Sequence, residues 1–238
     1  MTPPSLYILL TLNNVENLMS NNTINIALIG YGFVGKTFHA PLIRSVPGLN
    51  LAFVASRDEE KVKRDLPDVT VIASPEAAVQ HPDVDLVVIA SPNATHAPLA
   101  RLALNAGKHV VVDKPFTLDM QEARELIALA EEKQRLLSVF HNRRWDSDFL
   151  GIKQIIEQGT LGKIKHLESH IDRFRPEVRV RWREQNVSGS GLWFDLGPHL
   201  IDQTLQLFGL PQSVQGNIAT LRDAAEINDW AQDRKSVV

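Results

Sequence analysis

An aspartate and a histidine four residues apart, Asp195 and His199, form the first pattern in this sequence that could do chemistry. On a helix, this spacing puts both side chains on one face. A carboxylate beside an imidazole can act as a general base near neutral pH. The same pair could ligate a metal ion, but no third ligand with suitable spacing is evident, so no metal site is predicted. The plainer interpretation is a helix-start aspartate followed by a buried histidine.

A glycine-rich loop, Gly30-x-Gly32-x-x-Gly35, follows an apolar run and opens a helical pattern, as a dinucleotide-binding motif requires. Gly30 allows a tight turn, Gly32 lets a pyrophosphate approach the backbone, and Gly35 lets the helix pack close to the strand. Phe33 and Val34 lie at the helix start, whose N–H groups attract anions. A glycine turn without a ligand is the alternative, but the strand–helix units that follow favour the dinucleotide.

The residues after the second apolar run bear on which cofactor binds. An NAD-specific site usually has Asp or Glu there, roughly 20 residues beyond the glycine loop, to bind the ribose hydroxyls. In this sequence the place is taken by Ser56 and Arg57, which could donate to a 2′-phosphate and pair with it. Lys61 could add positive charge, whereas the nearby Asp58 could still serve NAD. The sequence therefore predicts NADP, with NAD as the alternative.

Polar residues also follow two later apolar runs. Ligands in open α/β sheets bind beyond the carboxyl ends of the strands. The residues at these ends that we predict to bind the cofactor are Ser91, Pro92, Asn93, His96, Asp113 and Lys114. Lys114, held before a proline, is well placed to donate a hydrogen bond near the nicotinamide, and an ordinary surface lysine is the alternative.

Buried-strand patterns alternate with helical patterns from residue 24 to about residue 140. The short runs rich in Val and Ile suit strands buried on both faces of a parallel sheet, and they are Asn25–Ile29, Leu51–Ala55, Leu86–Ile89, His109–Val112 and Leu137–Phe140. The helices predicted between them are Val34–Ser45, Pro75–Gln80, Thr95–Ala106 and Leu118–Lys133. This alternation predicts an α/β fold with a doubly wound parallel sheet of the Rossmann type.

The pattern changes after Phe140. The elements predicted there are helices at Trp145–Gln158 and Leu192–Phe208 and strands at Ile164–Phe174 and Val214–Leu221. We expect a non-structural N-terminal extension at 1–22, an NAD(P)-binding Rossmann domain at 23–141, and a C-terminal α+β substrate and oligomerisation domain with a mostly antiparallel sheet at 142–238. One or two strands do not make a stable sheet, so this last domain is predicted to be incomplete.

The composition limits the classes of partner. The chain has 238 residues, of which 44% are hydrophobic and 22% charged, as is usual for soluble globular proteins. A net charge of -3 gives no basic footprint for nucleic acid, and no apolar run approaches the roughly 18 residues of a membrane span. The absence of cysteine excludes disulfides and thiolate chemistry and is compatible with the cytosol. The sequence predicts a cytoplasmic protein with neither a nucleic-acid nor a membrane partner.

From Thr23 to about Asp233, the sequence resembles the glucose–fructose oxidoreductase / inositol dehydrogenase (Gfo/Idh/MocA) family of NAD(P)-dependent oxidoreductases. The matching features are Gly30-x-Gly-x-x-Gly35, Ser91-Pro-Asn-x-x-His96, Asp113-Lys-Pro115, Trp182-Arg183 and Asp195-x-Gly-x-His199-x-x-Asp202. Asp113 replaces the usual glutamate and keeps its negative charge. The stretches most similar to NADP-dependent scyllo-inositol dehydrogenases and related uncharacterised bacterial oxidoreductases are His141–Asp146, Arg175–Val178 and Trp182–Glu184.

This resemblance implies hydride transfer between nicotinamide C4 and a hydroxyl-bearing carbon of a polyol, inositol or sugar. It implies that His199 takes the hydroxyl proton, that Asp195 orients the imidazole, and that Lys114 lowers the pKa of the hydroxyl. Arg183 would approach the cofactor, and full-length members would be homo-oligomeric. A non-catalytic NADP-binding sensor on the same fold, or an inactive fragment of the enzyme, is the alternative.

Overall fold

The structure, a computed structural model, describes residues 23–236, and its contacts divide the chain after Phe140 into two compact units. The extension predicted at 1–22 lies outside the described residues. Within residues 23–236, no helix is both long enough and apolar enough to cross a membrane.

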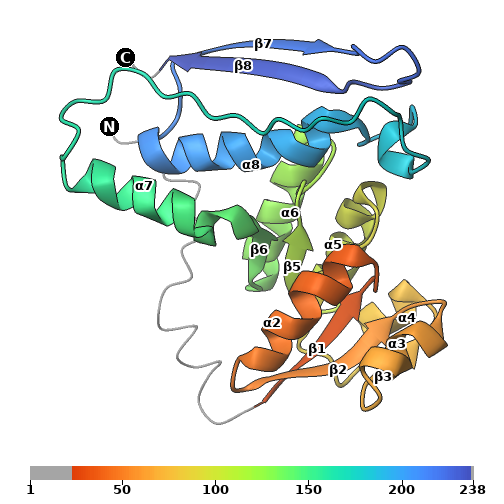
Figure 1. Cartoon of the computed structure of the whole chain (residues 1–238). Helices are drawn as coiled ribbons and strands as arrows, with labels where there is room; N and C mark the ends of the chain where they lie inside the picture. Colours follow the sequence, from red (N-terminus) through yellow and green to blue (C-terminus); the bar gives the residue numbers. More distant parts are fainter. Residues whose placement is uncertain (1–22, 237–238) are drawn as a thin grey trace. The chain divides into compact units, whose positions relative to one another are not determined.

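The first unit is built on one parallel sheet of six strands in the order β3-β2-β1-β4-β5-β6 (Figure 1). The strands are β1 (Ile24–Ile29), β2 (Leu49–Ala55), β3 (Thr70–Ile72), β4 (Leu86–Ile89), β5 (His109–Asp113) and β6 (Leu137–Phe140). The chain moves outward from β1 to one edge and then returns to build β4 to β6 on the other side. This reversal gives the predicted doubly wound Rossmann sheet, and it puts a topological switch point between β1 and β4.

Helices cover both faces of this sheet because successive strand residues point to opposite sides. In β1, Ile26 and Leu28 pack into one core, whereas Ala27 and Ile29 pack into the other. The first core is closed by α2 (Ala40–Ser45) and α3 (Glu59–Asp65). The second is closed by α4 (Pro75–Gln80), α5 (His96–Asn105) and α6 (Met120–Lys133).

The helices of the first unit begin where the sequence supplies caps. The Ser74 hydroxyl accepts a hydrogen bond from Ala77 N at 3.2 Å, ahead of α4. The predicted helix Leu118–Lys133 starts two residues late, at Met120, because the Asp119 carboxylate caps it. The predicted helix Val34–Ser45 contains a π-helical turn at Gly35–His39 before α2.

The sequence reading missed α3 and β3. Val62 is the one buried residue of α3, so the helix shows no apolar stripe, and β3 is only 3 residues long. The available signal was Asp58, whose carboxylate accepts a hydrogen bond from Lys61 N at 2.9 Å and so caps a first turn containing two glutamates.

The second unit contains α7 (Ser147–Glu157), α8 (Gly191–Phe208) and an antiparallel hairpin of β7 (Ser213–Ala219) and β8 (Trp230–Ser236). Short 3-10 turns occur at Asn142–Trp145 and Trp182–Glu184. Helix α8 runs alongside the hairpin (Figure 1). The two predicted helices and the strand at Val214–Leu221 are therefore present, with ends shifted by one or two residues.

The predicted strand at Ile164–Phe174 is wrong, because this segment has no regular secondary structure. Alternating polar and apolar residues specify a face, but a strand also needs a hydrogen-bonded neighbour, and none pairs with it among residues 23–236. Strand β8 was missed because only its first two residues, Trp230 and Ala231, are apolar. The apolar pattern alone therefore predicted a strand where there is none and overlooked the strand that pairs with β7.

Candidate active site

The glycine loop follows the carboxyl end of β1, at the switch point of the sheet. Gly30 has a φ of +100°, and a Cβ there would lie 2.7 Å from the carbonyl oxygen of Ala90. A Cβ on Gly35 would overlap the carbonyl oxygen of Gly30. Glycine is therefore required at both positions. Gly30 allows the turn and its close approach to the residue that follows β4, and Gly35 allows the helix to start tightly against the loop.

Gly32 differs from its two neighbours, since a Cβ there would meet no atom within 4 Å. Its carbonyl accepts a hydrogen bond from Lys36 N at 2.9 Å, which begins the helical turn, while Phe33 is exposed and Val34 half-buried. The loop therefore packs against backbone atoms at Gly30 and Gly35, and it leaves space beside Gly32. These residues fit a dinucleotide, whose pyrophosphate would meet the helix start.

The polar residues after β2 lie in a compact turn. The Ser56 hydroxyl donates to the Asp58 carbonyl at 3.2 Å and accepts from Asp58 N at 3.1 Å. The Asp58 carboxylate is engaged in capping α3. Arg57 is exposed, and no partner of its guanidinium occurs within the described residues. Lys61 is also exposed, so the turn presents two cations while its carboxylate faces the helix.

The loops after β4 and β5 are joined by a buried histidine. His96 is 1% exposed, and its Nδ1 lies 2.7 Å from the Pro115 carbonyl oxygen. Its Nε2 lies 3.0 Å from the Ser91 carbonyl oxygen. Pro92 is exposed and Asn93 is buried, both in the turn between β4 and α5.

The loop after β5 holds a buried carboxylate next to the predicted catalytic lysine. Asp113 is 8% exposed, and its Oδ1 accepts a hydrogen bond from Lys114 N at 2.7 Å. Its Oδ2 lies 3.9 Å from Nε2 of the buried His39, whose ring packs on Phe140 with 4.3 Å between centroids. The backbone of Lys114, which is half-buried, is therefore tied to the end of β5.

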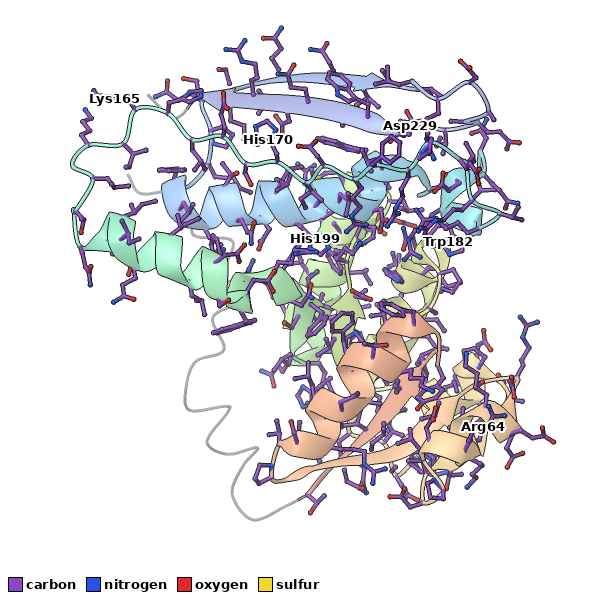
Figure 2. All side chains as sticks on the ribbon, in the orientation of Figure 1. Arg64, Lys165, His170, Trp182, His199 and Asp229 are labelled. Carbon is purple, nitrogen blue, oxygen red and sulfur yellow. The ribbon has the colours of Figure 1, made fainter. Side chains whose placement is uncertain are left out.

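The predicted catalytic residues of the second unit lie at the start of α8. Asp195 and His199 lie four residues apart in this helix and so share one face of it. His199, which is labelled in Figure 2, is 8% exposed. Asp195 Oδ1 lies 3.3 Å from Nε of Arg183, whose guanidinium carbon lies 4.5 Å above the Trp182 ring. Arg183, predicted to approach the cofactor, is thus placed against the carboxylate.

A second ion pair, between Arg144 and Asp202, lies one turn further along α8 than His199. The Asp202 carboxylate, 9% exposed, accepts two hydrogen bonds from Arg144, at 2.8 Å from Nε and 2.6 Å from Nη2. Nε2 of His141 lies 4.0 Å from Asp202 Oδ1. The sequence reading gave no role to this pair. The available signal was that Asp202 follows His199 by three residues and so lies on the same side of the helix.

A third cluster was also missed, and Arg222 is its centre. Arg222 Nη2 donates to Glu184 at 2.7 Å, and Nε donates to Asp229 at 2.7 Å. Burial alone would raise the pKa of Glu184, but hydrogen bonds from Arg222 and Arg181 outweigh it and hold that pKa below its usual value. Burial also raises the pKa of Asp229, but hydrogen bonds from Leu221 N and Arg222 outweigh this effect and lower that pKa. The cluster fixes the backbone just before α8.

An open cavity of about 1320 Å³ lies within the second unit, and the segment 163–176, α8 and the hairpin line it. Asp195 and Arg183 contribute to its wall, whereas His199 does not. In the part of the chain that the structure describes, no group of three or more His, Asp or Glu side chains could hold a metal ion.

Two family models match the chain. Residues 24–141 match the oxidoreductase family with an NAD-binding Rossmann fold, GFO/IDH/MocA, and residues 149–232 match the GFO/IDH/MocA C-terminal domain. The two matches cover the two units in order.

Relatives with names include two bacterial proteins. The uncharacterised oxidoreductase YdgJ of Escherichia coli is 58% identical over 212 residues, which are 89% of this chain and 61% of the relative. The scyllo-inositol 2-dehydrogenase (NADP(+)) IolW of Bacillus subtilis is 41% identical over 209 residues, which are 88% of this chain and 58% of the relative. The chain thus spans about three fifths of these relatives.

Solved structures share the fold. A crystal structure of an oxidoreductase from Klebsiella pneumoniae is 88% identical, with a TM-score of 0.83, over 91% of this chain and 59% of that one. An oxidoreductase structure from Yersinia pestis is 51% identical, with a TM-score of 0.86, over 92% of this chain and 62% of that one.

Proposed function

The chain belongs to the GFO/IDH/MocA family of oxidoreductases, and we propose that it serves NADP-dependent hydride transfer at a hydroxyl-bearing carbon of a polyol, inositol or sugar. The observation that carries this proposal is the glycine loop at the switch point. It is closed at Gly30 and Gly35 by backbone contacts and open at Gly32, as a site for a dinucleotide pyrophosphate must be. The Bacillus subtilis relative, named as an NADP-dependent scyllo-inositol 2-dehydrogenase, supports the substrate class.

Four groups of this chain have roles in the proposed reaction. NADP, when bound, supplies the nicotinamide that accepts or donates hydride. Lys114 donates a hydrogen bond to the substrate hydroxyl and lowers its pKa, and His199 takes the proton from that oxygen. Asp195 lies on the same face of α8 as His199, and its negative charge stabilises the imidazolium that forms on His199. Arg183, at 3.3 Å from Asp195, favours the ionised carboxylate.

The 2′-phosphate is proposed to bind at the turn after β2. Two exposed cations, Arg57 and Lys61, and the Ser56 hydroxyl lie there. The Asp58 carboxylate caps α3 and so does not need a ribose hydroxyl as partner. This arrangement favours NADP over NAD.

The test is a screen of polyols, inositols and sugars with NADP, read by the absorbance of the reduced nicotinamide. Lys114→Ala should lower turnover by at least about 100-fold while leaving NADPH affinity within about twofold, because a positioned proton-transfer or hydrogen-bonding group acts mainly on the chemical step. The matched control is Lys133→Ala, which removes a lysine that is likewise half-buried, at the end of α6. Full turnover in Lys114→Ala would contradict the proposal. A cytoplasmic location, predicted from the composition, and a homo-oligomeric state, implied by the family resemblance, stay predictions.

A further inference from the structure

His96 has a geometry that suits neither a cofactor ligand nor a packing residue. Its ring is 1% exposed, so bulk solvent and a bound ligand do not reach it directly. Both ring nitrogens instead lie within hydrogen-bond distance of backbone carbonyls, Pro115 at 2.7 Å and Ser91 at 3.0 Å. Carbonyl oxygens only accept, and a neutral imidazole carries a single N–H, so both contacts are hydrogen bonds when the ring is an imidazolium.

The two carbonyls belong to the two loops that we assign to the cofactor and the reaction. Ser91 follows β4, and Pro115 follows Lys114 at the end of β5. Each loop is held within itself as well. The hydroxyls of Ser91 and Thr95 lie 2.6 Å apart, and Lys114 N donates to Asp113 at 2.7 Å. The ring of His96 therefore ties one internally fixed loop to the other.

From this geometry we infer that His96 is a positioning residue, which fixes Lys114 against the Ser91 loop through the Pro115 carbonyl. The inference rests on the proposed function, because that function gives Lys114 and the Ser91 loop their roles. The contact with Pro115 lies one residue beyond Lys114, while the contact with Asp113 lies one residue before it. Lys114 is thus held from both sides, and loss of His96 leaves one side unsupported.

Two conservative variants separate the two contacts. The side-chain amide of asparagine reaches about as far as Nδ1 of histidine, and that of glutamine about as far as Nε2. His96→Asn should therefore keep the contact with Pro115 and lose that with Ser91, whereas His96→Gln should do the reverse. A residue that acts only on stability would not separate the loops in this way.

Hydrogen exchange of the full chain is the primary measurement. His96→Gln should speed exchange at the amides of Lys114 and Phe116 and leave that of Ser91 unchanged. His96→Asn should speed exchange at the Ser91 loop and raise the NADPH Kd by about tenfold, the order of effect that displaced binding loops produce. Where turnover is measurable, His96→Gln should lower kcat by about tenfold without changing the KM for NADP.

His109 offers a matched control on β5, the strand that Lys114 follows. It lies at the opposite end of β5 from Lys114, and its Nδ1 accepts a hydrogen bond from Leu136 N at 2.9 Å. His109→Phe and His96→Phe both remove ring nitrogens and keep a ring. Only His96→Phe should change exchange at both loops and weaken NADPH binding. His109→Phe should act near Leu136 alone.

The inference is overturned if the asparagine and glutamine variants behave alike, or if exchange at both loops stays as in the unaltered chain. Neither outcome depends on turnover. Failure of the proposed function would be seen separately. In that case neither the unaltered chain nor a full-length relative would turn over a polyol, inositol or sugar, while the asparagine and glutamine variants of His96 would still speed exchange at different loops.

Discussion

Replacing Arg57 by alanine should weaken NADPH binding without affecting NADH. Arg57 is exposed, its guanidinium has no partner among residues 23–236, and it is the second residue after the end of β2. Hydrogen bonds to charged groups contribute about 1.5–3 kcal/mol, which corresponds to roughly 10- to 150-fold in Kd. Because the guanidinium is exposed and screened by solvent, we expect the lower end, about tenfold.

The assay is titration of NADPH and NADH, followed by fluorescence, with the unaltered chain and Arg57→Ala. NADH affinity should change by less than about twofold, since NADH lacks the 2′-phosphate, and the difference between the two cofactors should shrink as salt is raised. The matched control is Arg64→Ala, which removes an exposed arginine from the last turn of α3 (Figure 2). Arg64 lies two turns beyond Asp58, so its loss should leave both affinities unchanged.

The reasoning is refuted if Arg57→Ala weakens NADPH and NADH equally, or if Arg64→Ala reproduces its effect. Asp58→Ala tests the competing assignment, in which that carboxylate binds the ribose of NAD. If it only caps α3, its loss should lower the free energy of unfolding by about 1 kcal/mol and leave the cofactor preference unchanged. A selective loss of NADH affinity in that variant would instead favour NAD.

Three further predictions concern the loop and the charge cluster. Gly35→Ala should lower the free energy of unfolding in urea by about 1–3 kcal/mol, because the new Cβ would overlap the carbonyl oxygen of Gly30. Gly32→Ala should leave the free energy of unfolding unchanged and weaken NADPH binding. Arg222→Ala should lower the free energy of unfolding in urea by about 3–5 kcal/mol, because the Asp229 side chain would be left buried without a cation and Glu184 would keep only Arg181; a cost below 1 kcal/mol would contradict this. Both carboxyls have a pKa lowered by folding, so their stabilisation is present above the unfolded values near pH 4 and is lost as pH falls through the folded ones. The Tm measured across pH 2–6 should therefore drop at low pH, and this drop should be smaller in Arg222→Ala, which keeps the hydrogen bonds from Arg181 to Glu184 and from Leu221 N to Asp229.

The Rossmann half could be predicted from the sequence because local signals and the global fold agree there. Each central strand is buried on both faces, so its apolar run is continuous, and the glycine loop follows the first of these runs directly. The second unit lacks this agreement. Residues 164–174 alternate as a strand does, yet β7 pairs instead with the polar β8, because strand pairing depends on neighbours that no local pattern names.

The same distinction explains which site residues could be predicted. Gly32, Arg57 and Lys114 could be singled out from the sequence because the position of each in a motif is enough to propose a role for it. Asp202 and Arg144 are 58 residues apart, and Glu184 and Arg222 are 38 apart, so neither pair is visible without the fold.

His96 lies between these two cases. Its place in a motif predicted contact with the cofactor, but its burial leaves the ring facing two carbonyls, of which one belongs to the loop after β4 and the other follows Lys114. A residue at a site can therefore act on the bound molecule through the backbone that it holds. Substituting it should alter loop exchange before it alters stability, and that order separates a positioning role from a packing role.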